Sequence, residues 1–261
     1  MPPRLGQHFL VNPAPVRIAL EALAVEKGDT VIEIGPGNGA LTFPLRETAR
    51  RAGANLTLIE RDNNLAAELR ARLRDADVEI IEGDAVLKLP ELLARERNHV
   101  KIAGNIPFYI TGKLLRVFGE APRPPERTVL MVQKEVAERL LAKPPKFNLL
   151  AAAVQFWATP KLLALVSRDS FSPPPKVDSA LILLERRSAR TEKERKRYYN
   201  ALRDIFRQPR KTVLNNVRKA TGMSRKETEN LLLRLLLPQS VRPQNLSPED
   251  ILHIAGAMEE E

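Results

Sequence analysis

Val31-Ile-Glu-Ile-Gly-Pro-Gly-Asn-Gly39 is the stretch that defines the fold, because it joins a β-rich apolar run to a glycine-rich turn that opens onto a helical pattern. Glycines let the backbone turn tightly and let a ligand approach it, and the N-terminus of the following helix adds a positive dipole end. The stretch therefore predicts a ligand site at the carboxyl end of a buried parallel strand.

Strand and helix patterns alternate through the first two-thirds of the chain. Strands are predicted at residues 30–34, 55–60, 78–82, 100–103, 127–132, 162–166 and 180–185, and helices at 15–25, 41–51, 63–73, 91–97, 111–118, 134–141 and 148–158. This series predicts an α/β fold with a doubly wound, seven-stranded sheet, whose last two strands are close enough in sequence to pair antiparallel.

The last quarter of the chain has a different pattern. From Thr191 onward it is wholly helical, with the charged run EKERKR at the junction. A domain boundary is expected near residue 188, which gives a first domain over residues 1–188 and a small all-helical domain over residues 189–261.

Composition excludes several classes of protein. The 261 residues include no cysteine, so disulfides, thiol nucleophiles and cysteine-ligated metals are excluded. His8, His99 and His253 lie far apart without ligand spacing, so no metal site is expected. No stretch has the apolar length of a membrane-spanning helix and no signal peptide is recognised, so we expect a cytoplasmic protein that binds no membrane.

The net charge of +10 comes from one segment. Residues 186–242 hold 17 Lys or Arg against 5 Asp or Glu, so all the excess positive charge lies there. Such an asymmetry is typical of a surface that neutralises nucleic-acid phosphates. A solvated helix face rich in Lys and Arg would give the same count, so charge alone leaves both interpretations open.

Two acidic residues indicate the kind of ligand. Glu60 ends the second predicted strand, 21 residues after Gly39, where its carboxylate can accept hydrogen bonds from ribose hydroxyls. Asp84 follows the third strand, where it can accept from an adenine amino group or serve only as a helix N-cap. Ala40 occupies the place of the third glycine of the dinucleotide fingerprint G-x-G-x-x-G, so S-adenosylmethionine fits better than a dinucleotide.

Asn105-Ile-Pro-Phe-Tyr-Ile-Thr111 follows the fourth predicted strand and is expected beside the same crevice. Pro107 fixes its own φ and biases Ile106 toward an extended conformation. The amide oxygen of Asn105 and a nearby backbone carbonyl can then both accept from an exocyclic amine. Phe108 is expected to stack on the base that carries this amine, whereas Tyr109 is expected in the core.

The chain resembles the KsgA-type rRNA adenine dimethyltransferases, relatives of the erythromycin-resistance rRNA methylases. The resemblance rests on four motifs: Gly6-Gln-His-Phe-Leu10, IEIGPGNGALT, NIPFYIT and Phe171-Ser-Pro-Pro-Pro-Lys-Val-Asp-Ser179. It extends over nearly the whole chain, since Phe206-Arg-Gln-Pro-Arg-Lys-Thr-Val-Leu-Asn215 looks like the family's basic helix. It implies a Rossmann-like methyltransferase domain followed by an RNA-binding domain, in a monomer that uses S-adenosylmethionine to dimethylate adenine N6 of small-subunit rRNA within a ribosomal precursor.

The resemblance also implies site residues. The methyl-donor site would comprise His8, Leu10, Gly35, Gly37, Glu60, Asp84 and Asn105; the catalytic set would comprise Asn105 with two aromatic walls, Phe108 and Phe171; RNA would be bound by Arg207, Arg210 and Lys211. Two positions depart from the commoner pattern, because Phe108 replaces a usual Tyr and His8 a frequent Asn. The three prolines after Ser172 form a stiff segment that can hold Phe171 over the pocket.

Three alternatives stay open. A methyltransferase of the resistance type would act on large-subunit rRNA, although the extended C-terminal domain and the triple proline favour the small subunit. A non-catalytic ribosome-assembly factor could share the fold, although the presence of Asn105, Glu60 and Asp84 counts against it. A nicotinamide dehydrogenase is disfavoured by the missing third glycine.

Overall fold

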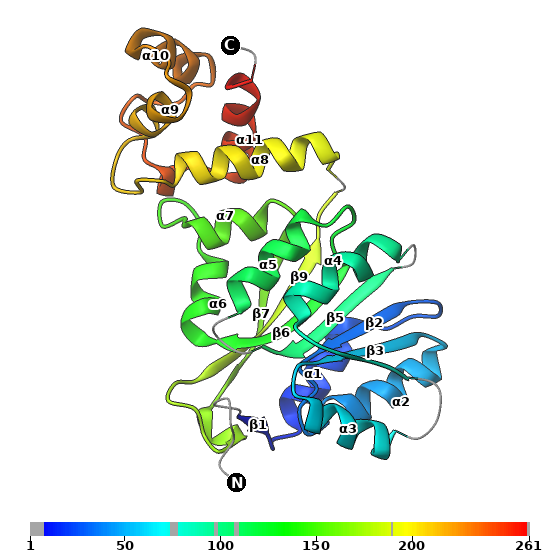
Figure 1. The fold of residues 1–261 in the computed structure, drawn as a ribbon. Helices are drawn as coiled ribbons and strands as arrows, with labels where there is room; N and C mark the ends of the chain where they lie inside the picture. The colour runs from blue at the N-terminus through cyan, green and yellow to red at the C-terminus, as the bar shows by residue number, and fades with distance from the viewer. Residues whose placement is uncertain (1–7, 74–77, 97–98, 107–109, 189, 260–261) are drawn as a thin grey trace. The chain divides into compact units, whose positions relative to one another are not determined.

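The computed structural model describes residues 8–73, 78–96, 99–106, 110–188 and 190–259 (Figure 1). The strands are β1 (Phe9–Leu10), β2 (Thr30–Ile34), β3 (Asn55–Glu60), β4 (Val78–Glu82), β5 (Val100–Asn105), β6 (Arg127–Gln133), β7 (Ala158–Val166), β8 (Phe171–Ser172) and β9 (Ser179–Arg186). The helices are α1 (Ala14–Leu23), α2 (Thr42–Ala52), α3 (Asn63–Arg72), α4 (Ala85–Arg95), α5 (Thr111–Glu120), α6 (Lys134–Leu141), α7 (Leu149–Gln155), α8 (Glu192–Ile205), α9 (Val213–Thr221), α10 (Arg225–Arg234) and α11 (Pro248–Ala257), with 3₁₀ turns at Arg168–Ser170 and Pro243–Asn245.

Within the described residues, seven strands form one sheet in the order β4-β3-β2-β5-β6-β9-β7. Strands β2 to β6 are parallel, and β9 runs antiparallel to β6. The chain winds outward in one direction from β2 and in the other from β5, so a crevice forms at their carboxyl ends. The predicted doubly wound α/β sheet is confirmed, and β7 and β9 are neighbours in it.

Helices cover both faces of this sheet because alternate residues of each strand point to opposite sides. On one face, Val31 and Leu58 pack in a cluster with Leu23, Leu45 and Leu69 from α1, α2 and α3. The other set of strand side chains, which includes Ile32 and Ile102, is equally buried. Helices α4 and α5, teal in Figure 1, contact each other and bury their own apolar stripes.

The largest differences from the predicted boundaries lie at α4 and at the junction of α7 with β7. Helix α4 begins at Ala85, six residues before the predicted start, because the Asp84 side chain accepts a hydrogen bond from the Val86 backbone nitrogen and caps the helix. Pro90 lies inside this helix, one residue before the predicted start. Helix α7 ends at Gln155, three residues before the predicted end. Ala158, which was predicted to be helical, is instead the first residue of β7.

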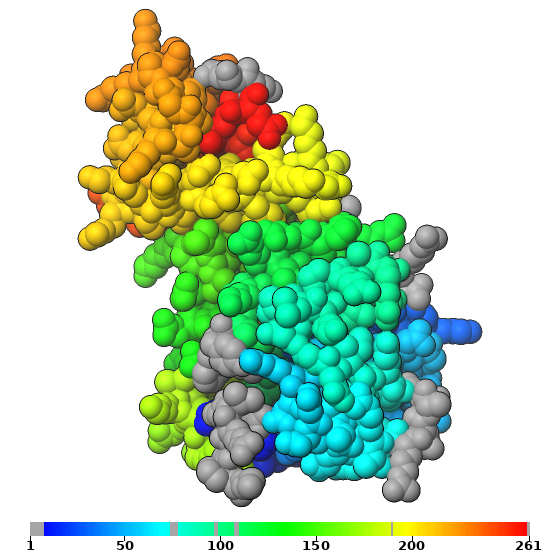
Figure 2. All heavy atoms as spheres, in the orientation of Figure 1, coloured from blue at the N-terminus to red at the C-terminus, as the bar shows by residue number. Residues whose placement is uncertain are grey.

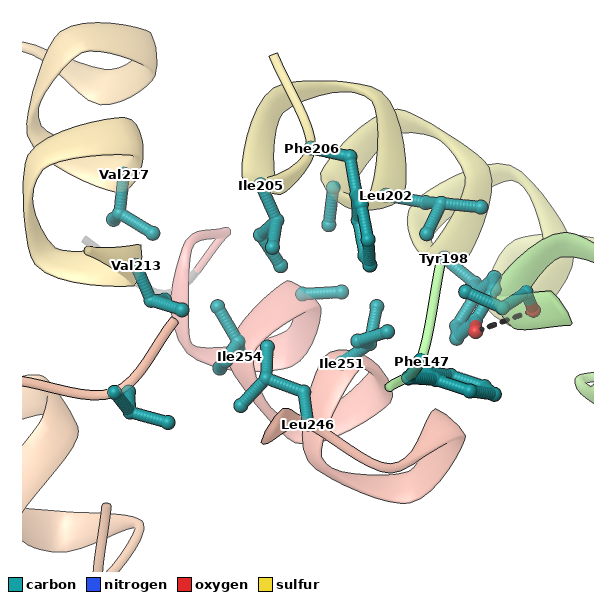
Figure 3. Close-up of a cluster of buried hydrophobic side chains, with 14 of the residues drawn as sticks. Phe147, Tyr198, Leu202, Ile205, Phe206, Val213, Val217, Leu246, Ile251 and Ile254 are labelled. Carbon is teal, nitrogen blue, oxygen red and sulfur yellow. Dashed lines mark hydrogen bonds between the residues drawn. The ribbon is translucent and has the colours of Figure 1, made fainter. Parts of the chain in front are cut away.

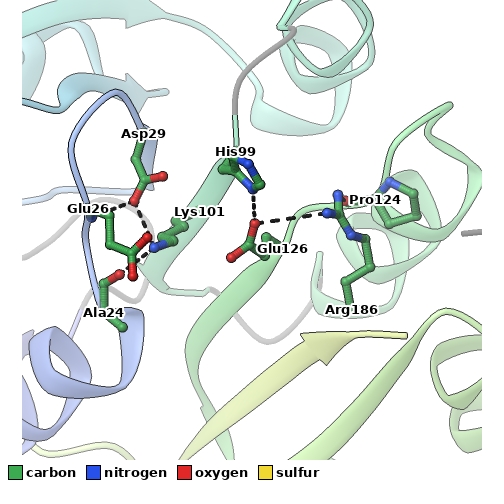
Figure 4. Close-up of polar contacts among 8 residues, drawn as sticks. All are labelled: Ala24, Glu26, Asp29, His99, Lys101, Pro124, Glu126 and Arg186. Carbon is green, nitrogen blue, oxygen red and sulfur yellow. Dashed lines mark hydrogen bonds and ion pairs between the residues drawn. The ribbon is translucent and has the colours of Figure 1, made fainter. Parts of the chain in front are cut away.

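A polar cluster holds the amino ends of the strands (Figure 4). Lys101 of β5 is buried and lies 2.7 Å from the carboxylate of Asp29, and its ammonium also donates to the backbone oxygen of Ala24. His99 contacts Glu126 beside it. A buried charge that has both an ion-pair partner and a hydrogen-bond acceptor is tolerated, and these contacts fix the end of α1 against β5.

The chain divides into two compact units, one of Met1–Ala137 with Thr159–Arg186 and one of Glu138–Ala158 with Arg187–Glu261. The second unit therefore includes α7 and the second half of α6, which the sequence pattern had assigned to the domain over residues 1–188. The physical reason is that α7 buries Ala151 and Ala152 in the same core as Tyr198 and Leu202 of α8. The chain order of elements alone does not reveal this packing.

The second unit has an apolar core of its own (Figure 3). Phe156 stacks on Tyr198 with ring centroids 3.8 Å apart, and the Tyr198 hydroxyl donates to the Ala152 backbone oxygen at 2.8 Å. Helix α8 starts at a capping box formed by Thr191 and Glu194. No helix of the described residues is both long and apolar enough to cross a membrane.

Candidate functional site

A cavity of about 330 Å³ lies in the first unit at the carboxyl ends of β2 and β5, where the strand order reverses. Every residue predicted for the methyl donor lines it: His8, Leu10, Gly35, Gly37, Glu60, Asp84 and Asn105. Phe171 lines it as well, whereas Phe108 lies outside the described residues, as do Pro107 and Tyr109. In the part of the chain that the structure describes, no cluster of His, Asp or Glu is arranged to hold a metal ion.

The glycine turn forms one wall of the cavity. Gly37 has φ +57°, a conformation that side-chain-bearing residues rarely adopt, and a Cβ added to it would lie 3.3 Å from the Phe9 ring. The Gly37 backbone nitrogen donates to Oε2 of Glu60 at 3.0 Å. The turn is therefore kept free of side chains at this point and is tied to the end of the neighbouring strand.

Glu60 accepts hydrogen bonds from two backbone nitrogens, a structural role that the sequence did not predict. Its side chain is buried, with 5% exposed, and its second oxygen, Oε1, accepts from the Asp62 backbone nitrogen at 2.9 Å. A carboxylate oxygen has two acceptor sites, so each oxygen retains capacity for a ligand hydroxyl. Glu60 thus holds the turn while still lining the cavity.

Asp84 likewise combines two features. Its Oδ1 accepts from the Val86 backbone nitrogen at 2.9 Å and so caps α4, which is the simpler of the two interpretations of this residue. The carboxylate also lines the cavity, where its remaining acceptor capacity faces the ligand space. An interaction with an adenine amino group stays a prediction.

Asn105 ends β5, and the backbone nitrogen of the next residue, Ile106, still donates across the sheet to the Met131 oxygen at 3.1 Å. The Asn105 side-chain nitrogen donates to the His8 backbone oxygen at 3.2 Å. This bond fixes the orientation of the amide, whose oxygen is the atom that can accept a hydrogen bond from a ligand.

A two-stranded pairing that the sequence did not predict forms part of the cavity wall. β1 and β8 pair antiparallel, with Phe9 opposite Ser172 and Leu10 opposite Phe171. The His8 ring nitrogen Nδ1 lies 2.7 Å from the Pro173 backbone oxygen. These contacts bring Phe171, which is 4% exposed, from the loop between β7 and β9 to the cavity.

Two further carboxyl groups line the cavity, those of Asp62 and of Glu33 on β2, and the sequence analysis selected neither. Glu33 is 2% exposed, and its Oε2 has no hydrogen-bond partner among the described residues. Burial raises the pKa of Glu33 to about 8; the Thr42 hydroxyl lowers it in part and the negative charge of Glu60 raises it further. One feature of the sequence could have identified Glu33: it is the only acidic residue in the predicted strand over residues 30–34.

The predicted RNA-binding residues lie in the second unit. Arg207, Arg210 and Lys211 are all exposed, and side chains of the orange segment around α9 and α10 project from the surface in Figure 2. The expected basic helix over 206–215 is not present as such, because residues 207–212 form the loop before α9. The reason is local: the Thr212 side chain accepts from the Asn215 backbone nitrogen and so starts the helix at Val213.

Comparison with known proteins identifies the family. The model of the ribosomal RNA adenine dimethylase family matches residues 2–259. The chain belongs to this family. Among curated members, the "ribosomal RNA small subunit methyltransferase A" of Dehalococcoides mccartyi (strain CBDB1) is 34% identical over 94% of this chain and 84% of its own length. That of Prochlorococcus marinus (strain MIT 9313) is 36% identical over 98% and 93%.

Two solved structures share the fold of this adenine dimethylase over nearly its whole length. A dimethyladenosine transferase from Plasmodium falciparum superposes with a TM-score of 0.76 at 26% identity, covering 95% of this chain and 96% of that protein. The 23S rRNA methyltransferase ErmE superposes with a TM-score of 0.71 at 25% identity, covering 96% and 99%.

Proposed function

We propose that this chain uses S-adenosylmethionine to dimethylate adenine N6 in small-subunit rRNA of a ribosomal precursor, acting as a cytoplasmic monomer. One observation carries the proposal: an amide (Asn105), two carboxylates (Glu60 and Asp84) and an aromatic ring (Phe171) from four separate segments line one cavity. Relatives named for the small subunit match up to 98% of the chain, which favours that substrate over the large subunit.

The residues present fit this methyl donor. A volume of about 330 Å³ suits a nucleoside-sized ligand. Glu60 and Asp84 supply acceptors for ribose hydroxyls and an adenine amine, and the backbone at Gly37 leaves room for close approach. When bound, S-adenosylmethionine supplies an electrophilic methyl group on a sulfonium.

The residues on the target side would orient the nitrogen that receives the methyl group. The Asn105 oxygen would accept from the adenine N6 amine, and the bond from its nitrogen to His8 keeps it in that orientation. As the amine becomes more tetrahedral and partly cationic, this hydrogen bond strengthens, which is differential binding of the transition state. The proton then leaves to solvent, and Phe171 would stack on the base, opposite Phe108.

The substrate would be an adenine that can leave its stack, because an amine inside a helix is out of reach. The second unit, which carries Arg207, Arg210 and Lys211, would bind phosphates and contribute most of the affinity for RNA. The first unit would then be the methyltransferase domain and the second the RNA-binding domain.

A second candidate deserves the same assay, since ErmE, which is similar over 96% of this chain, is a 23S rRNA methyltransferase. The test is to incubate the protein with isotopically labelled S-adenosylmethionine and separated small and large subunits from cells that lack these methylations, and to map labelled nucleotides by mass spectrometry. We expect dimethyladenosine in small-subunit rRNA. Label confined to large-subunit rRNA would instead support the resistance-type activity. Cofactor binding without any transfer would support an assembly factor.

A further inference from the structure

Glu33 is a buried carboxyl group for which the proposed mechanism has no use. It lies in the middle of the sheet on β2, where its neighbours in register are Leu58 on β3 and Ala103 on β5. Neither neighbour can donate a hydrogen bond from its side chain, and Oε2 has no partner among the described residues. An unsatisfied buried acceptor is costly, so such a group calls for a ligand or a function.

Among the residues that the structure describes, no cation is found to act on Glu33. The charged group that acts on it is Glu60 from β3, which is negative, and Thr42 from α2 offers only a hydroxyl. Helix α1 faces the cavity with apolar side chains, such as Val16. Lys101, the basic residue of β5, pairs with Asp29 at the opposite end of the strands.

The cavity as a whole is therefore acid-rich. Four carboxyl groups line it, those of Glu33, Glu60, Asp62 and Asp84, against two basic side chains, Arg61 and His8. An apolar cavity with this balance favours a ligand that carries positive charge. S-adenosylmethionine carries a sulfonium and an ammonium group, and so matches the imbalance.

We infer that Glu33 is a positioning residue that faces the positive charge of S-adenosylmethionine and gives up its proton to the solvent when this ligand binds. The inference rests on the proposed function. In the free protein the group is a neutral carboxylic acid below about pH 8. On binding, its O–H bond breaks, the electron pair stays on the carboxylate, and the proton passes to the buffer.

The test is isothermal titration calorimetry of S-adenosylmethionine binding near pH 6.5, where the ligand's amine is protonated, in two buffers with different ionisation enthalpies. The dependence of the heat on the buffer gives the number of protons released. We expect about one for the wild type and about zero for Glu33→Gln, with weaker binding. Equal proton release by both proteins would overturn the inference.

Two controls sharpen this experiment. Glu47→Gln, on the adjacent helix α2, alters a carboxylate whose side chain is 42% exposed and whose pKa is lowered to about 2 by its hydrogen bonds to Arg50 and Arg51, so this variant should behave as wild type. S-adenosylhomocysteine keeps the ammonium but lacks the sulfonium charge. If binding of S-adenosylhomocysteine still releases a proton, the ammonium is the partner of Glu33. If it releases none, the partner is the sulfonium.

The wild type alone provides a second measurement if Glu33→Gln does not fold. The dissociation constant should fall as pH rises from about 5.5 to 7, where the ligand's amine stays protonated, by up to about tenfold per pH unit, because the proton that Glu33 must lose on binding is easier to release at higher pH. A constant affinity over this range would overturn the inference while leaving the proposed methylation intact. Absence of any S-adenosylmethionine binding would instead contradict the proposed function itself.

Discussion

The side-chain nitrogen of Asn105 donates a hydrogen bond to the backbone oxygen of His8, 97 residues earlier in the chain. His8 in turn contacts the Pro173 oxygen, and β1 beside it pairs with β8. The amide at the end of β5 is thus oriented by the same N-terminal segment that positions Phe171. We infer that the methyl-accepting side of the cavity is held together by this segment.

Asn105→Ala should abolish methyl transfer while leaving binding of S-adenosylmethionine measurable, because the lost oxygen acts on the amine that receives the methyl group. We expect turnover to fall by at least roughly 10²-fold, as for other single donors or acceptors at a reacting centre. Single-turnover kinetics and calorimetry on the same preparation measure the two effects separately. Near-normal turnover would remove Asn105 from the mechanism.

Gly37→Ala should weaken S-adenosylmethionine binding by about tenfold or more, because the added Cβ combines strain at φ +57° with crowding of the Phe9 ring at the cavity wall. Gly28→Ala is the matched control, since Gly28 has φ +83° and nothing within 4 Å of its added Cβ. Both variants should lose about 1 kcal/mol of unfolding free energy. If Gly28→Ala weakened S-adenosylmethionine binding as much as Gly37→Ala does, the loss of affinity would come from backbone strain in general and not from the position of Gly37 at the cavity wall.

Glu33→Gln should change how stability depends on pH. Burial raises the pKa of Glu33 from 4.5 to about 8, so between these values the folded state holds a proton that the unfolded state has released. The free energy of unfolding of the wild type should therefore fall as pH rises across this window, by a few kcal/mol, and level off above it.

The glutamine variant is neutral at every pH and should lack this fall, so it should be the more stable protein near pH 8.5. Urea unfolding at about pH 5 and 8.5 measures the difference. Glu47→Gln serves again as control, since the lowered pKa of Glu47, about 2, leaves it ionised throughout the window. A parallel decline in wild type and Glu33→Gln would assign the effect to other groups.

Replacing Arg207, Arg210 and Lys211 together by Gln should weaken RNA binding and flatten its dependence on salt, without altering S-adenosylmethionine affinity. Each lost phosphate contact reduces the slope of log K against log salt by about 0.7–0.9. Lys27, Arg50 and Arg51 are three exposed cations outside the basic segment, and their joint replacement is the control. An unchanged slope in the first variant would mean that its three residues are only a solvated surface.

The sequence by itself determined the parallel strands, their order of appearance and the residues at their carboxyl ends. Strands β2, β3, β5 and β6 are buried on both faces, so each appears in the sequence as a short apolar run that predicts a strand without any knowledge of the rest of the fold. Glu60 and Asn105 end their strands, and Gly37 and Asp84 lie within three residues of the end of theirs; the fold then brings the ends of these parallel strands to one edge of the sheet.

Only the tertiary structure decided the features that depend on contacts between distant segments. β1 and β8 are two residues long, too short for any periodicity, and they pair across more than half of the chain. The assignment of α7 to the helical unit rests on Ala152 meeting Tyr198, and the neutral state of Glu33 rests on burial by neighbouring elements. A local sequence pattern predicts which residues are buried, but it does not predict which residues surround them in the fold. Hydrogen bonds and ionisation states depend on those surrounding residues.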